Sequence, residues 1–125
     1  MIHRGLLLLC LAGCSSAGPT AAANSTIRVT ARQYAWTFEY PGGATSEELR
    51  LTAGEEVTLM ITSRDVIHAL SIPEFKVKVD AVPGRLATVT FRAGAPGTYD
   101  APCAEYCGLG HSTCGTKVVV VARDR

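Results

Sequence analysis

TIRVTARQYAWTFEY, residues 26–40, is the stretch that decides the fold. Its apolar side chains fall on alternate residues of two short runs: Ile27, Val29 and Ala31, then Trp36, Phe38 and Tyr40. Successive side chains of a β-strand point to opposite faces, so this period of two predicts two half-buried strands. The three aromatic residues are expected to be part of the core.

The same alternation recurs along the rest of the chain, at Leu49 and Leu51, at Val57, Leu59 and Ile61, at Val77 and Val79, and at Ala87, Val89 and Phe91. Turn-forming glycine and proline residues separate these runs. The continuous apolar run Val118–Val121 predicts a strand that is covered on both faces. No segment has sustained helical periodicity. The pattern favours one all-β domain, an antiparallel sandwich or barrel.

Composition narrows the possible functions. The 125 residues carry a formal net charge of +1, and 18% of them are charged. This balance lacks the basic surface of a nucleic-acid-binding protein. The sequence also lacks paired carboxylates, a nucleophile elbow and a phosphate-binding loop. We therefore do not expect the chain to be a catalyst on its own.

The N-terminus is interpreted as a targeting segment. A short basic start and an apolar run end in Leu11-Ala12-Gly13-Cys14, which resembles the bacterial lipobox. The run is too short to span a bilayer. This predicts a lipoprotein signal peptide over residues 1–13, a lipidated Cys14 with a flexible tether over 14–25, and a folded domain over 26–125. Such a protein would be held at the cell membrane by its lipid, facing the periplasm or the cell exterior. An ordinary signal peptide or a buried apolar N-terminus is the alternative.

CAEYCGLGHSTC, residues 103–114, contains the residues with metal-binding chemistry. Cys103, Cys107 and Cys114 lie within 12 residues, and His111 stands between the last two. Thiolate and imidazole together suit copper, zinc or iron–sulfur centres. Three cysteines are an odd number, so pairing leaves at least one thiol over. The glycines of the loop allow it to fold tightly enough for its ligands to converge.

Three blocks of this sequence resemble the copper A domain of cytochrome c oxidase subunit II, a Greek-key cupredoxin. The loop matches the C-x-E-x-C-G-x-x-H pattern from Cys103 to His111. DVIH at residues 65–68 and DAVPGR at 80–85 match a second signature, and QYAWTFEY at 33–40 matches a third. The resemblance implies one-electron transfer, within a haem–copper oxidase or as a separate carrier, with cytochrome c or another donor as partner. It also implies two copper ions bridged by the two cysteines.

The resemblance also implies a role for each ligand. Cys103 and Cys107 would bridge the coppers, His111 and the backbone carbonyl of Glu105 would complete one copper, and His68 would bind the other. Asp65 and Asp80 are interpreted as turn or ion-pair residues without a catalytic role.

Cys114 departs from the family, which has methionine at this position. We predict that Cys114 is also a metal ligand. Because a thiolate is charged and a thioether is neutral, a thiolate at this position predicts a lower reduction potential. A protonated, unligated Cys114 and a disulfide with Cys103 or Cys107 are the alternatives. Two further departures are the lack of the transmembrane helices usual in the family and Tyr34, where many members have a tryptophan thought to receive the electron.

Two other functions fit the same loop. A copper-handling protein would bind Cu(I) through the three thiols and pass it to another protein. A structural zinc site would close a tetrahedron from three cysteines and one histidine, but would leave His68 without a role.

Overall fold

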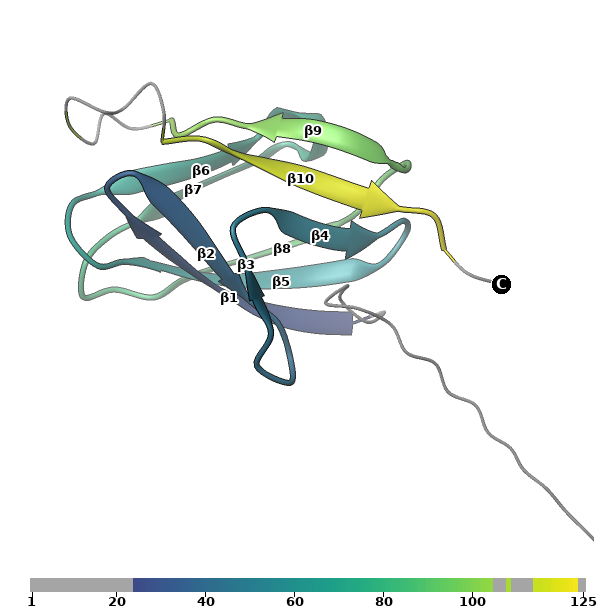
Figure 1. The fold of residues 1–125 in the computed structure, drawn as a ribbon, viewed down its shortest axis with the longest axis horizontal. Helices are drawn as coiled ribbons and strands as arrows, with labels where there is room; N and C mark the ends of the chain where they lie inside the picture. Colours follow the sequence, from purple (N-terminus) through teal and green to yellow (C-terminus); the bar gives the residue numbers. More distant parts are fainter. Residues whose placement is uncertain (1–23, 105–107, 109–113, 124–125) are drawn as a thin grey trace, which may run out of the picture.

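The computed structural model describes residues 24–104, 108 and 114–123, and these form an all-β structure (Figure 1). The all-β prediction is therefore confirmed. Its elements are β1 (Asn24–Arg32), β2 (Ala35–Glu39), β3 (Thr45–Ser46), β4 (Leu49–Thr52), β5 (Glu56–Ser63), β6 (His68–Ile72), a 3₁₀ turn η1 (Pro73–Phe75), β7 (Val77–Ala81), β8 (Ala87–Arg92), β9 (Gly97–Ala101) and β10 (Thr116–Val121). Among these elements no helix is long and apolar enough to cross a bilayer.

The strands form two main sheets and a hairpin. The larger sheet has the order β3-β2-β1-β5-β8 and the smaller one β4-β10-β9, while β6 pairs with β7. Most pairs are antiparallel, as expected, but β1 pairs with β5 and β4 with β10 in parallel. Parallel neighbours cannot be joined by a tight turn, so the chain returns to each of them by a long connection. Alternation within a strand reveals which residues are buried but not the direction of its neighbour.

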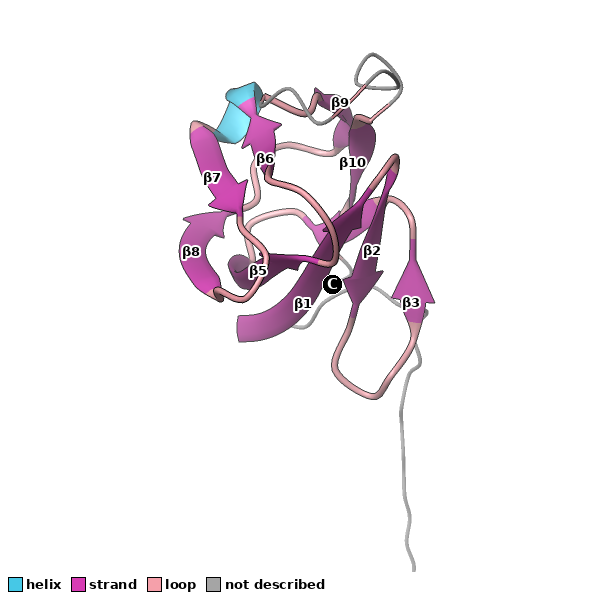
Figure 2. Cartoon of the chain, turned by 90° about the vertical axis from the view of Figure 1, so that its left-hand side faces the viewer, coloured by secondary structure: helices cyan, strands magenta, loops and turns pink. Residues whose placement is uncertain are grey.

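The β6–β7 hairpin lies between the β8 edge of the large sheet and β9 of the small one (Figure 2). Two contacts attach the chain after β9 to this hairpin. Leu70 forms an antiparallel bridge with Cys103, and the Ala104 amide donates to the Ala69 carbonyl at 2.8 Å. At one end of the sandwich, β1, β5, β7 and β9 finish while β2, β6, β8 and β10 begin. We call this the metal end.

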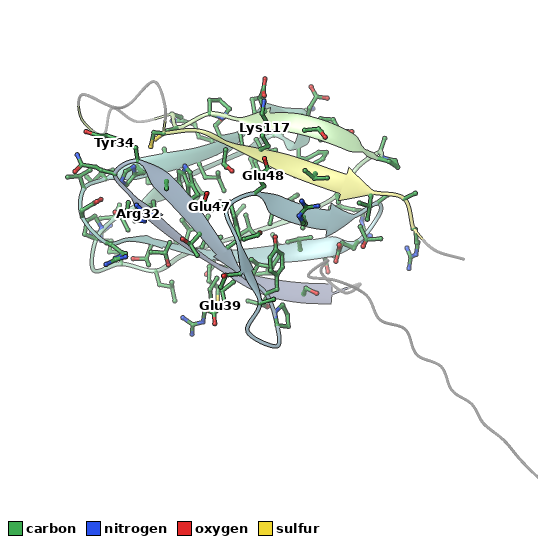
Figure 3. All side chains as sticks on the ribbon, viewed as in Figure 1. Arg32, Tyr34, Glu39, Glu47, Glu48 and Lys117 are labelled. Atoms are coloured by element: carbon green, nitrogen blue, oxygen red, sulfur yellow. The ribbon has the colours of Figure 1, made fainter. Side chains whose placement is uncertain are left out.

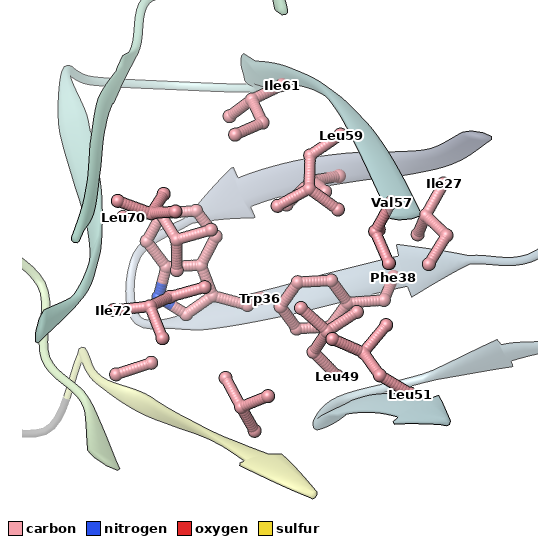
Figure 4. Packing of buried hydrophobic residues seen from close by; sticks show 14 of the residues in the cluster. Ile27, Trp36, Phe38, Leu49, Leu51, Val57, Leu59, Ile61, Leu70 and Ile72 are labelled. Atoms are coloured by element: carbon pink, nitrogen blue, oxygen red, sulfur yellow. The ribbon is translucent and has the colours of Figure 1, made fainter. Parts of the chain in front are cut away.

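The core fills the space between the sheets (Figure 4). Trp36, Phe38 and Tyr40 are at most 3% exposed, which confirms that this aromatic run is buried. The prediction that residues 118–121 are covered on both faces is wrong, since Val118 and Val120 are buried but Val121 is 40% exposed. The reason is that β10 belongs to a sheet with one face on the core and the other at the surface.

Residues 1–23 lie outside the described part of the chain, so the signal peptide, Cys14 and most of the tether stay predictions. Strand β1 begins at Asn24, before the predicted domain boundary at residue 26.

Glu55 is an unusual buried carboxylate at the turn between β4 and β5. It is 3% exposed, its Oε1 accepts a hydrogen bond from the Thr52 amide, and its Oε2 has no partner among the described residues. Burial raises the pKa of Glu55 above its ordinary value, although the bonds from Thr52 partly oppose this. Folding therefore favours the protonated form of Glu55. The stability that this raised pKa gives the folded protein is present at low pH and is lost as the pH rises through the folded-state pKa.

We expect Glu55→Gln to stabilise the protein at pH 7, by up to about 1 kcal/mol, because it removes a buried charge. The gain should shrink as the pH falls below 4.5, where the parent carboxyl is protonated as well. Chemical denaturation at both pH values measures this. Glu56→Gln is the matched control, since Glu56 is exposed. Equal effects of the two substitutions would contradict the prediction.

Candidate metal centre

His68 is the first residue of β6 and is fully buried. Its pairing with Ala81 of β7 holds the backbone at the metal end. The two ring nitrogens have different partners: Nε2 lies 3.0 Å from Asp65 Oδ1, and Nδ1 lies 3.3 Å from Cys114 Sγ. Since an ionised carboxylate only accepts hydrogen bonds, Nε2 carries the proton. The lone pair of Nδ1 is then directed at the sulfur.

Cys103 and Cys114 are held by the pairing of β9 with β10. The last pair at the metal end joins Ala101 to Thr116, and continuing the same register sets Cys103 opposite Cys114. The bridge to Leu70 fixes Cys103 against β6 as well. The two residues are 8% and 0% exposed, respectively. Cys103 is therefore presented from a bridged backbone, and Cys114 from the residues directly before β10.

The side chains of His68, Cys103 and Cys114 converge. Nδ1 or Nε2 of the histidine and the two Sγ atoms all lie within 4.8 Å of one another. Soft thiolates beside an imidazole form a donor set that suits copper. The structure thus brings together three residues that sequence analysis predicted as ligands, although they are separated by up to 46 residues.

Three other predicted ligands, Glu105, Cys107 and His111, lie outside the described residues and stay predictions. Gly108, between them, has a φ of +134°. A Cβ at Gly108 would come within 2.6 Å of Gln33 Nε2 and 2.7 Å of Tyr34 Oη. The side chains of the turn between β1 and β2 thus reach Gly108. Both contacts are made by the ends of side chains that can move aside, so the positive φ is the feature that favours glycine here.

Asp65 orients the histidine. Besides His68, its carboxylate accepts hydrogen bonds from the Gln33 amide at 2.8 Å and the Val66 amide at 2.6 Å. Burial alone would raise the pKa of Asp65, but the bonds from Gln33, His68 and Val66 outweigh it and lower the pKa to about 2. Asp65 is therefore a permanently charged partner that fixes the ring and its tautomer. Asp65 was interpreted as a turn or ion-pair residue, and its hydrogen bond to His68, a predicted ligand, was missed. The spacing Asp-x-x-His was the available signal.

Trp36 supports the centre from the core side. Its Nε1 donates to the Cys114 carbonyl at 2.5 Å, and its ring meets that of His68 edge-on at a centroid distance of 6.0 Å. Figure 4 shows the indole between Leu70 and the core of the large sheet. No pattern in the sequence indicates that a core tryptophan binds the backbone of a residue 78 positions away.

We expect Trp36→Phe to weaken both the fold and the centre. The Cys114 carbonyl would lose its buried donor, which costs about 1–3 kcal/mol, and the backbone that presents this sulfur would loosen. Denaturation of the metal-free protein and copper titration measure the two effects. Phe38→Leu, an equally buried change without a bond to the site, should lower stability but leave copper affinity within about twofold. Equal losses of affinity in both variants would refute the role of this bond.

The sequence profile of the family "Cytochrome C oxidase subunit II, periplasmic domain" matches residues 43–122. The chain belongs to this subunit II family. The predicted resemblance is confirmed, and with it the cupredoxin class of the fold.

Individual relatives of this chain are also named as subunit 2 of an oxidase. Cytochrome c oxidase subunit 2 of Thermostichus vulcanus is 44% identical over 95 residues, which cover 75% of this chain and 29% of the relative. Heme-copper oxidase subunit 2 of Aeropyrum pernix is 43% identical over 104 residues, covering 78% of this chain and 44% of the relative. The chain therefore spans less than half the length of these relatives.

A solved structure shares the fold of this subunit II domain. The periplasmic domain of cytochrome oxidase subunit II (CoxB) from Bradyrhizobium japonicum superposes with a TM-score of 0.74 at 30% identity, covering 81% of this chain and 86% of that one.

Proposed function

We propose that this protein transfers single electrons through a thiolate-bridged pair of copper ions, as the subunit through which electrons enter a haem–copper oxidase. The observation that carries the proposal is the convergence of His68 Nδ1 and the two sulfurs of Cys103 and Cys114 within the buried metal end. Membership of the subunit II family and the oxidase names of its relatives support it.

The proposed ligands are His68, Cys103, Cys107, His111, Cys114 and the carbonyl of Glu105. When bound, the two coppers supply a centre that gains and loses one electron. Two shared sulfurs spread the change in charge over several bonds, so each bond alters little.

The described residues bury and position three of the proposed ligands. Asp65 orients the imidazole of His68, Trp36 holds the Cys114 backbone, and β6 holds Cys103. Ligands that are held in this way in the folded chain would need little rearrangement when the electron arrives, which favours fast transfer.

We also propose that Cys14 carries a lipid and that the domain is tethered to the outer face of a cell membrane. The lipobox-like Leu11–Cys14 segment supports this. With such a tether the domain can either dock on an oxidase core or act as a separate carrier. Detergent partitioning of the exported parent and of Cys14→Ser tests the anchor, since the variant should move to the aqueous phase.

Anaerobic copper titration of the reduced protein, followed by visible and paramagnetic resonance spectra, tests the function. We expect two coppers per chain, a purple colour and seven-line hyperfine splitting. A colourless Cu(I) complex that passes its metal to a chelator would favour copper handling. One tightly held zinc with silent spectra would favour a structural site. Either of these two outcomes contradicts electron transfer.

A further inference from the structure

Three arginines from different segments lie at the metal end. Arg32 ends β1, Arg64 follows β5, and Arg85 lies between β7 and β8. The segments are joined side by side: the Arg64 amide donates to the Ala31 carbonyl at 2.9 Å, and Ser63 bridges to Pro83. Arg32 and Arg64 line one hollow of about 450 Å³ together with Gln33 and Asp65.

These guanidinium groups have no ion-pair partner among the described residues. The ion pairs found there join His68 to Asp65 and Lys117 to Asp100. Two carboxylates lie nearby: Asp65 is engaged by His68 and two backbone amides, and Asp80 lines the neighbouring hollow with Arg85. Figure 3 shows Arg32 at the left-hand end, with Glu39 at the lower edge of the sandwich and away from it. The three arginines and the two carboxylates named here therefore leave this end with a net charge of +1 among these side chains.

Apolar side chains lie among these arginines. Of the five large hydrophobic residues that are exposed in the described chain, four are at the metal end: Tyr34 (36%), Val66 (38%), Ile67 (46%) and Leu86 (51%). Val66 and Ile67 directly precede His68, so a molecule that covers them comes close to a proposed ligand. Exposed apolar residues with a charged rim are typical of a protein-docking surface.

We propose that the metal end docks an electron-donor protein whose own contact face is acidic around an apolar centre. This inference rests on the proposed electron-transfer function and adds the chemistry of the partner. Complementary charge steers two proteins together and penalises like-charged pairs. A donor ringed by lysines would meet Arg32, Arg64 and Arg85 and would be disfavoured.

Two small one-electron oxidants of opposite charge test the electrostatic potential at the metal end. They are anionic ferricyanide and cationic tris(phenanthroline)cobalt(III). The reduced, copper-loaded protein is mixed with each in a stopped-flow instrument at low and high salt. We expect ferricyanide to react more slowly as salt rises and the cobalt complex to react faster.

Arg64→Glu should slow ferricyanide roughly fivefold at low salt and speed the cobalt complex, and adding Arg32→Glu should enlarge both effects. Arg92→Glu is the control: it makes the same charge change at the far end of β8, so it should alter both rates by less than about twofold.

A protein donor gives a second test. A lysine-rich cytochrome c should reduce the oxidised parent protein more slowly than it reduces the Arg32→Glu/Arg64→Glu double variant.

Equal effects of Arg64→Glu and Arg92→Glu, or a parent that reacts faster with the lysine-rich cytochrome than the double variant, would overturn the acidic-partner inference. Electron transfer would still stand, because both oxidants would have generated the purple colour of the oxidised centre from the reduced protein. A protein that takes up no copper pair would overturn both.

Discussion

Replacing Cys114 with methionine should raise the reduction potential of the copper-loaded protein by on the order of 100 mV. Cys114 Sγ lies 3.3 Å from His68 Nδ1, in the position of a further ligand. As a thiolate it adds a negative charge that favours the oxidised centre. A unit charge about 3 Å away, at an effective dielectric constant near 20, is worth several kcal/mol. For a one-electron couple this corresponds to more than about 100 mV.

Potentiometric titration of both proteins, monitored at the thiolate-to-copper absorption, measures this shift. Cys114→Ser is a useful control because it removes the thiolate without introducing a thioether, and its potential should rise as well. An unchanged or lower potential in Cys114→Met would mean that Cys114 is not a charged ligand. That result would leave the other cysteines as ligands but would refute our interpretation of this departure from the family.

Asp65→Asn should lower copper affinity about 10–100-fold, the usual cost of losing a carboxylate behind a ligating histidine. The amide that replaces the carboxylate can either donate or accept towards His68 Nε2, so the ring tautomer is no longer fixed. The substitution also removes the negative charge that holds the Gln33 and Val66 amides. Competition with a Cu(I) chelator of known affinity measures the loss.

Asp80→Asn is the matched control, since Asp80 is also an acidic residue beside the metal end but makes no ion pair among the described residues. It should leave affinity within about twofold. Thermal unfolding of the metal-free variants separates positioning from general destabilisation. An Asp65→Asn protein that unfolds earlier but binds copper like the parent would give Asp65 a purely structural role.

Much of the fold could be predicted because alternation is a local property. Val57, Leu59 and Ile61 are fully buried, as their spacing indicates. The parallel pairs could not be found in this way, because strand direction depends on which distant strand lies alongside. The run of valines in β10 led to the wrong prediction that this strand is covered on both faces. Valine is also common at half-buried and exposed strand positions, so its presence at Val121 does not require burial.

Part of the candidate site could likewise be predicted from the sequence, and part of it could not. Cys103 and Cys114 were predicted as ligands because they belong to a closely spaced set of cysteines beside a histidine, whereas His68 was predicted only through the resemblance to the subunit II family. Their mutual distances required the fold, since His68 begins β6 while Cys114 lies just before β10, a strand of another sheet. Trp36 was not assigned to the centre because it binds the backbone of Cys114, which lies 78 positions away in the sequence. Asp65 lies only three residues before His68, so its contact could have been predicted from the Asp-x-x-His spacing.

The anchoring of Cys103 against β6 has a consequence for how the chain matures. The sulfurs and His68 meet only after β9 and β10 have paired and the β6–β7 hairpin has docked on them. Contacts between segments so distant in sequence form slowly, typically over milliseconds to seconds in all-β domains. Folding must therefore run nearly to completion before these three side chains are close enough to bind a metal, so the proposed copper ions would be bound by a chain that has already folded.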